Sequence, residues 1–339
     1  MSLNVTFDEK DLQPTEEVPT GKALGGTELM QKWLHDRLDP ELVNYFQWIA
    51  SRKRKLEEKP RLFWVHDLAQ DPEVQFLKEK PEEGMGLFEK IIFVSHWQQY
   101  QYAVYLGIPY DHGVVVQHAI EPIPIHEKPN DKISCIYMST PHRGLELLLD
   151  AWELMKKEYP SEAVDSAELN IFSSFKIYDR PHMDEQYRHV YKKAEDMNSV
   201  NYNGTVSNEV IREELQRNHI FAYPSTYIET ACICAIEAMS AGCLCVVPNL
   251  GAIPETCANF AWLYGYEPDP GRHIKVHATI LAKAINSYWK DETQGLLKMQ
   301  KQYYDVFYSW NLRINQWTQL LKAMKSGIEE RKNKNDNGT

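Results

Sequence analysis

The sequence predicts an α/β protein built from two doubly wound domains, and three observations support that prediction. The chain has 339 residues, enough for two domains of roughly 150 residues each. Short apolar runs alternate with amphipathic stretches of helical length along almost the whole chain. One proline-rich interruption, EPIPIHEKPND at 121–131, has the composition of a linker.

The short apolar runs are expected to be strands. In chain order they cover 3–7, 43–50, 61–67, 90–95, 113–118, 133–139, 168–174, 200–204, 219–225, 243–249 and 260–265. Stretches with apolar residues at three- and four-residue spacing are expected to be helices, at 26–38, 96–107, 143–159, 208–218 and 232–242. Strands that alternate with helices form parallel sheets covered by helices on both faces.

The linker divides the chain into an N-terminal domain, 1–130, and a C-terminal domain that begins at residue 131. Ligands are expected at the carboxyl ends of the strands, in the cleft between the domains. The polar end of the chain, 326–339, is expected to be disordered.

Charge and composition exclude some classes of partner. The formal net charge of −11 argues against nucleic acid, which needs a basic surface. There is no apolar signal region and no run near 18 apolar residues, so a cytoplasmic protein is expected. The basic cluster at 52–59 is either a solvated helix face or a patch for weak peripheral contact with the inner membrane surface. The oligomeric state stays open.

No metal or cofactor is expected. The six cysteines form no C-x-x-C pair, and their apolar surroundings favour structural thiols in a reducing compartment. The histidines show no metal-ligand spacing, and no D-x-D carboxylate pair occurs.

Two motifs suit a phosphate group. Gly25 and Gly26 precede an amphipathic helix whose N–H groups could meet a phosphate, although Thr27 could equally mark an ordinary helix start. Arg143 lies where a strand meets a helix, and its guanidinium could hold a diphosphate through two parallel hydrogen bonds. The alternative for Arg143 is a surface arginine, which the helix dipole disfavours at that position.

Three further side chains are candidates for sugar chemistry. His66 follows a strand of the first domain, where it could bond a hydroxyl or transfer a proton, or could be structural. Glu229 and Glu237 frame the run TACICAI, with Glu229 in a loop and Glu237 inside a helix that begins near Cys232. Either they contact a sugar and a ribose, or they are a helix-dipole residue and a solvated helix position.

The segment YIETACICAIEAMSAGCLCVVPNLGAIPE resembles the signature of retaining glycosyltransferases of the GT-B fold, in particular glycosyltransferase family 4. That signature has two glutamates separated by seven residues, then Ala-Met, a strand and a Gly-x-x-Pro-Glu element, here Gly251 to Glu255. GGTE, RGLELLLDAW, FVSHWQQYQYAVYLGIP, FSSFK and NGTVSNEVIREEL are similar to other segments of the family in the same order. FYSWNLRINQWTQLL resembles its terminal helix, so 310–325 would complete the first domain and the second would end at 309.

The resemblance implies a metal-independent, retaining transfer of a hexose from a nucleoside diphosphate sugar to a hydroxyl of a glycan, lipid or small molecule. Glu229 would contact the transferred sugar and His66 would lie near the acceptor. Arg143 would grip the diphosphate and act electrostatically on the leaving group. Glu237 would hold the ribose. The other implied contacts to the nucleotide sugar are Gly25, Gly26, Thr27, Lys176, Thr205, Val206, Thr230, Ala231 and Cys232.

The sequence departs from the family pattern at the donor site. Ser139–Thr140 stands where the family has Gly-Arg, so one phosphate-binding cation is missing, and Lys176 or Arg180 could replace it. The loop after Glu229 lacks the usual glycines, and His118–Ala119 replaces Asn-Gly. Two alternatives follow: a degenerate relative that binds nucleotide or glycan without catalysis, and a glycoside hydrolase that uses Glu229 and Glu237.

Overall fold

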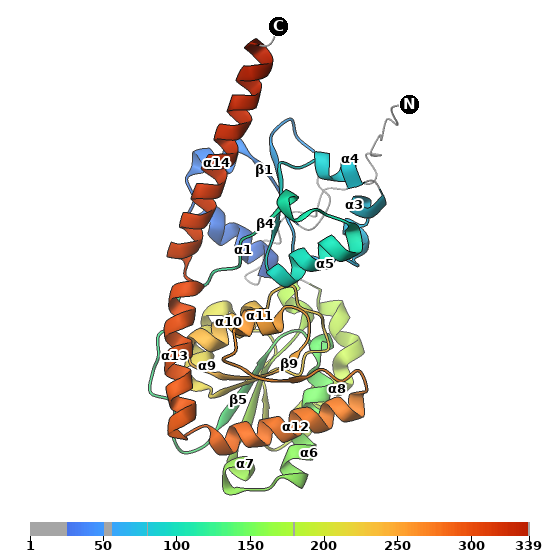
Figure 1. Ribbon diagram of the computed structural model, residues 1–339. Coiled ribbons are helices and arrows are strands. Elements are labelled where there is room, and N and C mark those ends of the chain that lie inside the picture. The colour runs from blue at the N-terminus through green and yellow to red at the C-terminus, as the bar shows by residue number, and fades with distance from the viewer. Residues whose placement is uncertain (1–25, 51–55, 80, 179, 338–339) are drawn as a thin grey trace. The chain divides into compact units, whose positions relative to one another are not determined.

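The computed structural model describes residues 26–50, 56–79, 81–178 and 180–337, and these have the α/β fold with parallel sheets that the sequence predicts. They divide into two compact units, each with its own sheet (Figure 1). Unit 1 consists of 26–119 and 310–337, and unit 2 consists of 120–309. The predicted strand at 3–7, Gly25 and residues 52–55 of the basic cluster lie outside the described residues.

Unit 1 contains a four-stranded parallel sheet in the order β1-β2-β3-β4. Its strands are β1 (Gln47–Ala50), β2 (Arg61–Trp64), β3 (Lys90–Phe93) and β4 (Gly113–Val115). Its helices are α1 (Gly26–His35), α2 (Pro40–Tyr45), α3 (Phe76–Glu79), α4 (Pro81–Gly86), α5 (His96–Leu106) and α14 (Trp310–Asn337), with 3-10 turns η2 (Pro72–Val74) and η3 (Tyr110–His112). The C-terminal helix therefore returns to the unit that holds the first strands, as expected for the fold class.

Both faces of the unit 1 sheet are buried by alternate residues of its strands. Ile49 pairs in register with Phe63, and both lie in a core shared with residues of α5. Trp48 and Trp64 point to the other face, where the ring centroid of each lies 5.2 Å from that of Trp317 in α14. The C-terminal helix thus supplies part of the core of unit 1.

The predicted strand at 43–50 is correct only for residues 47–50, because a helix start precedes it. Asp39 caps α2 by accepting a hydrogen bond of 2.9 Å from the Glu41 N–H, and Pro40 suits the first helical position. Residues 43–45 therefore belong to α2. The capping signal overrides the apolar run.

Helix α14 continues to Asn337, so the structure differs from the disorder predicted for 326–339. Ile328 is buried, and Arg331 forms an ion pair of 2.6 Å with Glu89. These two contacts anchor a segment whose composition alone is that of a frayed tail.

Unit 2 contains a six-stranded parallel sheet in the order β10-β9-β8-β5-β6-β7. Its strands are β5 (Ser134–Met138), β6 (Glu168–Phe172), β7 (Val200–Tyr202), β8 (Ile220–Ala222), β9 (Leu244–Asn249) and β10 (Trp262–Gly265). Its α-helices are α6 (Leu145–Glu158), α7 (Glu162–Ser166), α8 (Arg188–Asp196), α9 (Asn208–Arg217), α10 (Ile233–Ser240), α11 (Ile253–Cys257), α12 (Pro270–Ser287) and α13 (Asp291–Phe307). Its 3-10 turns are η4 (Pro141–Arg143), η5 (Phe175–Tyr178) and η6 (Pro181–Tyr187).

Helices cover both faces of the unit 2 sheet, with α6 and α12 on one side and α10 and α11 on the other (Figure 1). Strands covered on both faces are expected to be continuous apolar runs, as β5 and β9 are. The two ends of unit 2 meet: the Ile120 N–H donates to the Tyr308 carbonyl at 2.8 Å, and Ile120 forms an isolated bridge with Ser309.

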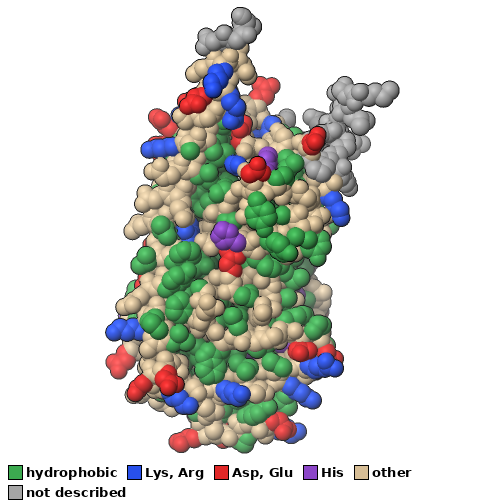
Figure 2. Space-filling view, viewed as in Figure 1, with side chains coloured by type: hydrophobic (Ala, Val, Ile, Leu, Met, Phe, Trp, Pro, Cys, Tyr) green, Lys and Arg blue, Asp and Glu red, His purple; other side chains and the backbone are tan. Residues whose placement is uncertain are grey.

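The surface shown in Figure 2 carries basic and acidic side chains interspersed over unit 2. An anionic ligand therefore depends on cations and hydrogen-bond donors gathered locally at its site. Among the described residues, no helix combines the length and hydrophobicity needed to cross a lipid bilayer.

Candidate active site

The strand order of unit 2 reverses between β5 and β8, which are neighbours in the sheet. The chain proceeds from β5 outward to β6 and β7, and from β8 outward to β9 and β10 in the opposite direction. In open parallel sheets, ligands bind outside the carboxyl ends of the strands at such a switch point. The segments that follow β5 and β8 contain Arg143 and Glu229, two of the predicted site residues.

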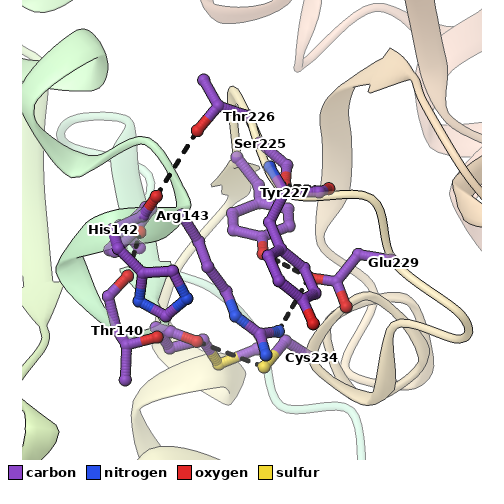
Figure 3. Close-up of polar contacts among 11 residues, drawn as sticks. Thr140, His142, Arg143, Ser225, Thr226, Tyr227, Glu229 and Cys234 are labelled. Atoms are coloured by element: carbon purple, nitrogen blue, oxygen red, sulfur yellow. Dashed lines mark hydrogen bonds and ion pairs between the residues drawn. The ribbon is translucent and has the colours of Figure 1, made fainter. Parts of the chain in front are cut away.

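Arg143 and Glu229 form an ion pair at this switch point (Figure 3). Arg143 Nη1 lies 2.8 Å from Glu229 Oε1, and the Tyr223 hydroxyl donates to the same oxygen at 2.6 Å. The Glu229 side chain is 5% exposed and that of Arg143 is 22% exposed, so neither is a solvated surface residue. In the described part of the chain both contacts use Oε1, which leaves Oε2 to accept from a ligand hydroxyl.

Electrostatics keep Arg143 charged. Burial alone disfavours the Arg143 guanidinium, but Glu229 and then the neighbouring tyrosines outweigh it and raise its pKa well above the ordinary value. Burial, and then the Glu229 carboxylate, raise the pKa of Tyr223 well above its usual range, so Tyr223 remains a hydroxyl donor. The Arg143 guanidinium also lies over the ring of Tyr227, 4.4 Å from its centroid.

Two glycines allow close packing of the backbone segments that contain Arg143 and Glu229. Gly144 ends η4 with φ +109°, and a Cβ there would lie 2.4 Å from the Pro224 carbonyl oxygen. Gly251 has φ +60°, and a Cβ there would lie 2.6 Å from the Glu229 carbonyl oxygen. Only glycine fits both the backbone conformation and the space at these positions.

Five buried side-chain atoms beyond the carboxyl ends of β5, β6 and β7 have no hydrogen-bond partner among the described residues. They are Thr140 Oγ1, His142 Nδ1, Arg143 Nε, Ser173 Oγ and Thr205 Oγ1. Buried polar groups in native proteins are usually paired, so a cluster of unpaired ones indicates a site that a polar ligand satisfies.

Glu237 is buried and paired, so it is not a solvated helix position. It lies in α10, its side chain is 13% exposed, and Arg212 Nη1 of α9 approaches its Oε1 at 3.3 Å. Arg212 Nη2 also bonds the Glu121 carbonyl at 2.8 Å. Burial raises the pKa of Glu237, and the charge of Arg212 partly opposes that rise.

The remaining predicted residues of unit 2 flank the pair. Thr230 and Ala231 are half-buried, and buried Cys232 directly precedes α10, where the sequence placed the helix start. Thr205 and Val206 lie half-buried between β7 and α9. By contrast, the side chains of Lys176 and Arg180, the candidates for the missing cation, are exposed.

In unit 1, Gly26 and Thr27 begin α1, and His66 follows β2. The His66 ring stacks on that of His118, with centroids 5.4 Å apart and planes at 13°. Burial, and then the nearby His118, lower the pKa of His66 well below its ordinary value. Burial and Arg313 lower the pKa of His118 to about 3, so His118 is neutral at pH 7.

Sequence reasoning missed three residues of the site: Tyr223, Tyr227 and His142. Tyr223 and Tyr227 were hidden because aromatic residues after a strand are usually core. His142 was visible as part of the strand-to-helix turn but had no assigned role.

In the portion of the chain that the structure describes, no group of three or more His, Cys, Asp or Glu side chains could hold a metal ion.

The fold is the GT-B fold of glycosyltransferases. The family model for glycosyl transferases group 1 matches residues 121–305, more than half of the chain. The chain therefore belongs to that family and is a glycosyltransferase. No curated protein matches the sequence significantly.

Solved structures share the fold at low sequence identity. A glycosyltransferase from Rickettsia africae is 14% identical, with 92% of this chain and 84% of that chain covered and a TM-score of 0.65. A trehalose-phosphate synthase (UDP-forming) from Burkholderia vietnamiensis is 11% identical, with 80% and 68% covered and a TM-score of 0.61. HepE from Anabaena, solved in complex with UDP-glucose, is 16% identical, with 78% and 72% covered and a TM-score of 0.59.

Proposed function

We propose that this protein is a retaining, metal-independent glycosyltransferase that moves a sugar from a nucleoside diphosphate sugar to a hydroxyl acceptor. The observation that carries the proposal is the Arg143–Glu229 ion pair at the switch point of unit 2, in a turn that also holds unpaired polar atoms of Thr140 and His142. Family membership supports transfer rather than the hydrolysis that two glutamates alone would also allow.

Arg143 serves the leaving group. Negative charge grows on the diphosphate as the bond to the sugar breaks, and a fixed guanidinium stabilises that charge without reorganising. Arg143 is held by Glu229 and by the ring of Tyr227, so its position is set before the donor arrives. A divalent ion is not required for this role.

Glu229 and Glu237 serve the two sugars of the donor. Glu229 Oε2 accepts from a hydroxyl of the transferred sugar while Oε1 stays with Arg143 and Tyr223. Glu237, paired with Arg212, accepts from the ribose hydroxyls. Thr205 and Val206 contact the base, and Thr230 to Cys232 line the sugar subsite. Lys176, whose side chain is exposed, belongs to the same proposal as a further cation, and Gly25, Gly26 and Thr27 belong to it as amide donors.

The acceptor hydroxyl attacks from the side of the departing diphosphate, whose oxygen takes the proton, so the anomeric configuration is kept. His66 is the acceptor-side residue. As a neutral imidazole it donates or accepts one hydrogen bond and carries no charge.

A thermal-shift panel of UDP-, GDP- and ADP-sugars tests the proposal. A bound donor stabilises the fold by about 2.7 kcal/mol at a hundredfold excess over Kd, so one base should stand out. Turnover of that donor in chelator, followed by NMR of the product anomer, tests metal independence and retention. An inverted product anomer would refute the retaining mechanism, and loss of turnover in chelator would refute metal independence.

Glu229→Gln separates catalysis from binding. The amide keeps the size of the side chain and an acceptor for Tyr223, so nucleotide binding should persist while turnover falls at least about a hundredfold. Arg143→Ala alone leaves a buried carboxylate unpaired, which costs roughly 3–5 kcal/mol of stability. The matched double variant Arg143→Met/Glu229→Gln removes both charges and tests nucleotide binding in a folded protein. A protein that binds a donor but never turns it over would be the degenerate relative.

A further inference from the structure

The turn between β5 and α6 concentrates unpaired polar atoms. Within four residues it holds Thr140 Oγ1, His142 Nδ1 and Arg143 Nε, all buried and none with a hydrogen-bond partner in the described ranges. Thr140 is 3% exposed, so bulk solvent does not reach its hydroxyl. Such a concentration of unsatisfied groups is unfavourable in the free protein and is expected where a ligand supplies the missing partners.

Charge balance shows why Arg143 alone is a weak diphosphate site. Its guanidinium is already neutralised by Glu229 at 2.8 Å, so the pair has no net charge. A nucleoside diphosphate brings more than one negative charge at neutral pH. Lys176 and Arg180 are exposed, so neither supplies a fixed, desolvated donor. The turn itself offers further donors that are buried and fixed.

His142 is held in a fixed orientation beside Arg143. Its ring stacks on Phe175, with centroids 5.3 Å apart and planes at 16°, and meets the edge of Tyr227 at 5.7 Å and 88°. The Thr226 hydroxyl donates to the His142 carbonyl at 3.4 Å, which ties the turn to the segment after β8. Figure 3 shows the His142 and Arg143 side chains leaving the turn next to each other, with Thr140 beside the imidazole.

We infer that His142 is a second side-chain ligand of the donor diphosphate, donating through Nδ1–H beside Arg143, with the Thr140 hydroxyl as a third. The inference rests on the proposed function and names the residue that takes the place of the missing cation. Burial, and then the charge of Arg143, lower the pKa of His142 to about 4, so the free ring is neutral at pH 7. A neutral imidazole still donates one N–H, and it can do so from Nδ1.

Two substitutions distinguish the role of the Nδ1–H as a hydrogen-bond donor from the role of the imidazole ring in packing. His142→Phe keeps an aromatic ring to stack on Phe175 but has no N–H. His142→Asn loses the ring, yet its amide nitrogen occupies nearly the position of Nδ1 and still donates. Arg180→Ala is the control, because it removes an exposed cation of the neighbouring turn, and Lys176→Ala tests the competing cation of the proposed function.

Calorimetric titration at pH 7.5 with UDP, GDP and ADP in turn gives the readout, with the matching nucleosides as phosphate-free probes. His142→Phe should weaken binding of the preferred diphosphate roughly tenfold, the effect of losing one hydrogen bond to a charged group. His142→Asn should stay within about threefold of the wild type, as should the Arg180→Ala control. Nucleoside binding should be the same in all variants.

The outcomes distinguish this inference from the proposed function. Wild-type affinity for the diphosphate in His142→Phe, or equal weakening in the Phe and Asn variants, overturns the role of Nδ1 and leaves the glycosyltransferase proposal standing. Full loss in Lys176→Ala would assign the second donor to that lysine instead. If the wild type binds none of the three diphosphates, both proposals fail. Unchanged melting temperatures would show that the variants are folded.

Discussion

Gly251 lies directly against the peptide of Glu229. A Cβ on Gly251 would come within 2.6 Å of the Glu229 carbonyl oxygen and 2.8 Å of its amide nitrogen. The next residue, Ala252, donates its N–H to the same carbonyl at 2.8 Å. The Gly-x-x-Pro-Glu element therefore fixes the backbone that presents the Glu229 carboxylate to Arg143.

Gly251→Ala should reduce both stability and activity. The left-handed backbone at φ +60° and the clash with Glu229 together cost about 1–3 kcal/mol, and relief of the clash moves the carboxylate. Urea unfolding and donor turnover measure the two effects. Gly295→Ala is the control: it lies within α13 with open space around it, so stability should rise by about 0.5–1 kcal/mol. Full activity in Gly251→Ala would contradict the assigned contact.

Tyr223→Phe should lower the free energy of unfolding and the donor turnover while it leaves the shape of the site unchanged. It removes the hydroxyl that donates to Glu229 at 2.6 Å in a fully buried setting, which costs roughly 1.5–3 kcal/mol. Donor turnover should fall because the carboxylate loses one of its two anchors. In Tyr159→Phe the lost bond to Thr279 is exposed, and the change in the free energy of unfolding should stay under about 0.5 kcal/mol. Equal effects in the two variants would refute the anchoring role.

Stability should decrease as pH falls from about 6.5 towards 4. Burial lowers the pKa of His273 to about 4, and burial and then His273 lower that of His277 to about 3. In the unfolded chain the histidine pKa is about 6.5. Between these values the unfolded state binds more protons than the folded state. The free energy of unfolding therefore decreases as the pH is lowered. Melting temperatures from pH 7.5 to 4.5 measure this slope.

A double variant isolates the contribution of these two histidines. The Tyr264 hydroxyl lies 2.9 Å from His273 Nε2 and 3.0 Å from His277 Nδ1. His273→Gln/His277→Asn places amides near both nitrogens, which preserves the hydrogen bonds but removes the titration. The fall in melting temperature with acid should become shallower. An unchanged slope would assign the acid sensitivity to other groups.

Trp317→Ala should unfold unit 1 selectively. Trp317 is 1% exposed and contacts the rings of Trp48 and Trp64, and truncation of such a residue costs about 3–5 kcal/mol. Amide hydrogen exchange should speed up in β1 to β4 while β5 to β10 remain protected. Trp289→Ala, at a half-exposed ring, is the control and should leave both sheets protected. Equal loss of protection in both sheets would contradict the placement of α14 in unit 1.

The sequence was sufficient for the fold class because that property depends on local periodicity. The alternation of apolar runs and amphipathic stretches predicted parallel sheets, and the start of α10 at Cys232 was predicted within one residue. Local signals also explain the error at 43–45, where the cap at Asp39 began a helix. The end of α14 depends on Arg331 pairing with Glu89, a contact that no local pattern predicts.

The site was only partly predictable from the sequence, because its geometry depends on contacts between residues far apart in the chain. Arg143 and Glu229 were identified singly, but their ion pair joins two loops that only the β5–β8 pairing brings together. The packing of Gly251 against the Glu229 peptide is likewise a tertiary contact that the sequence alone does not show. The exposure of Lys176 could not be inferred from its neighbours in the chain, so Lys176 was a candidate for the missing cation whereas His142 was not.

The meeting of Ile120 with Ser309 has a consequence for biosynthesis. Within the described residues, unit 2 is the single stretch 120–309, whose two ends adjoin, whereas unit 1 is assembled from 26–119 and the helix α14, which follows unit 2 in the chain. On the ribosome, residues 120–309 are complete before α14 has been translated. Unit 2 can therefore fold during elongation, whereas unit 1 waits for the codons of α14, which supply Trp317.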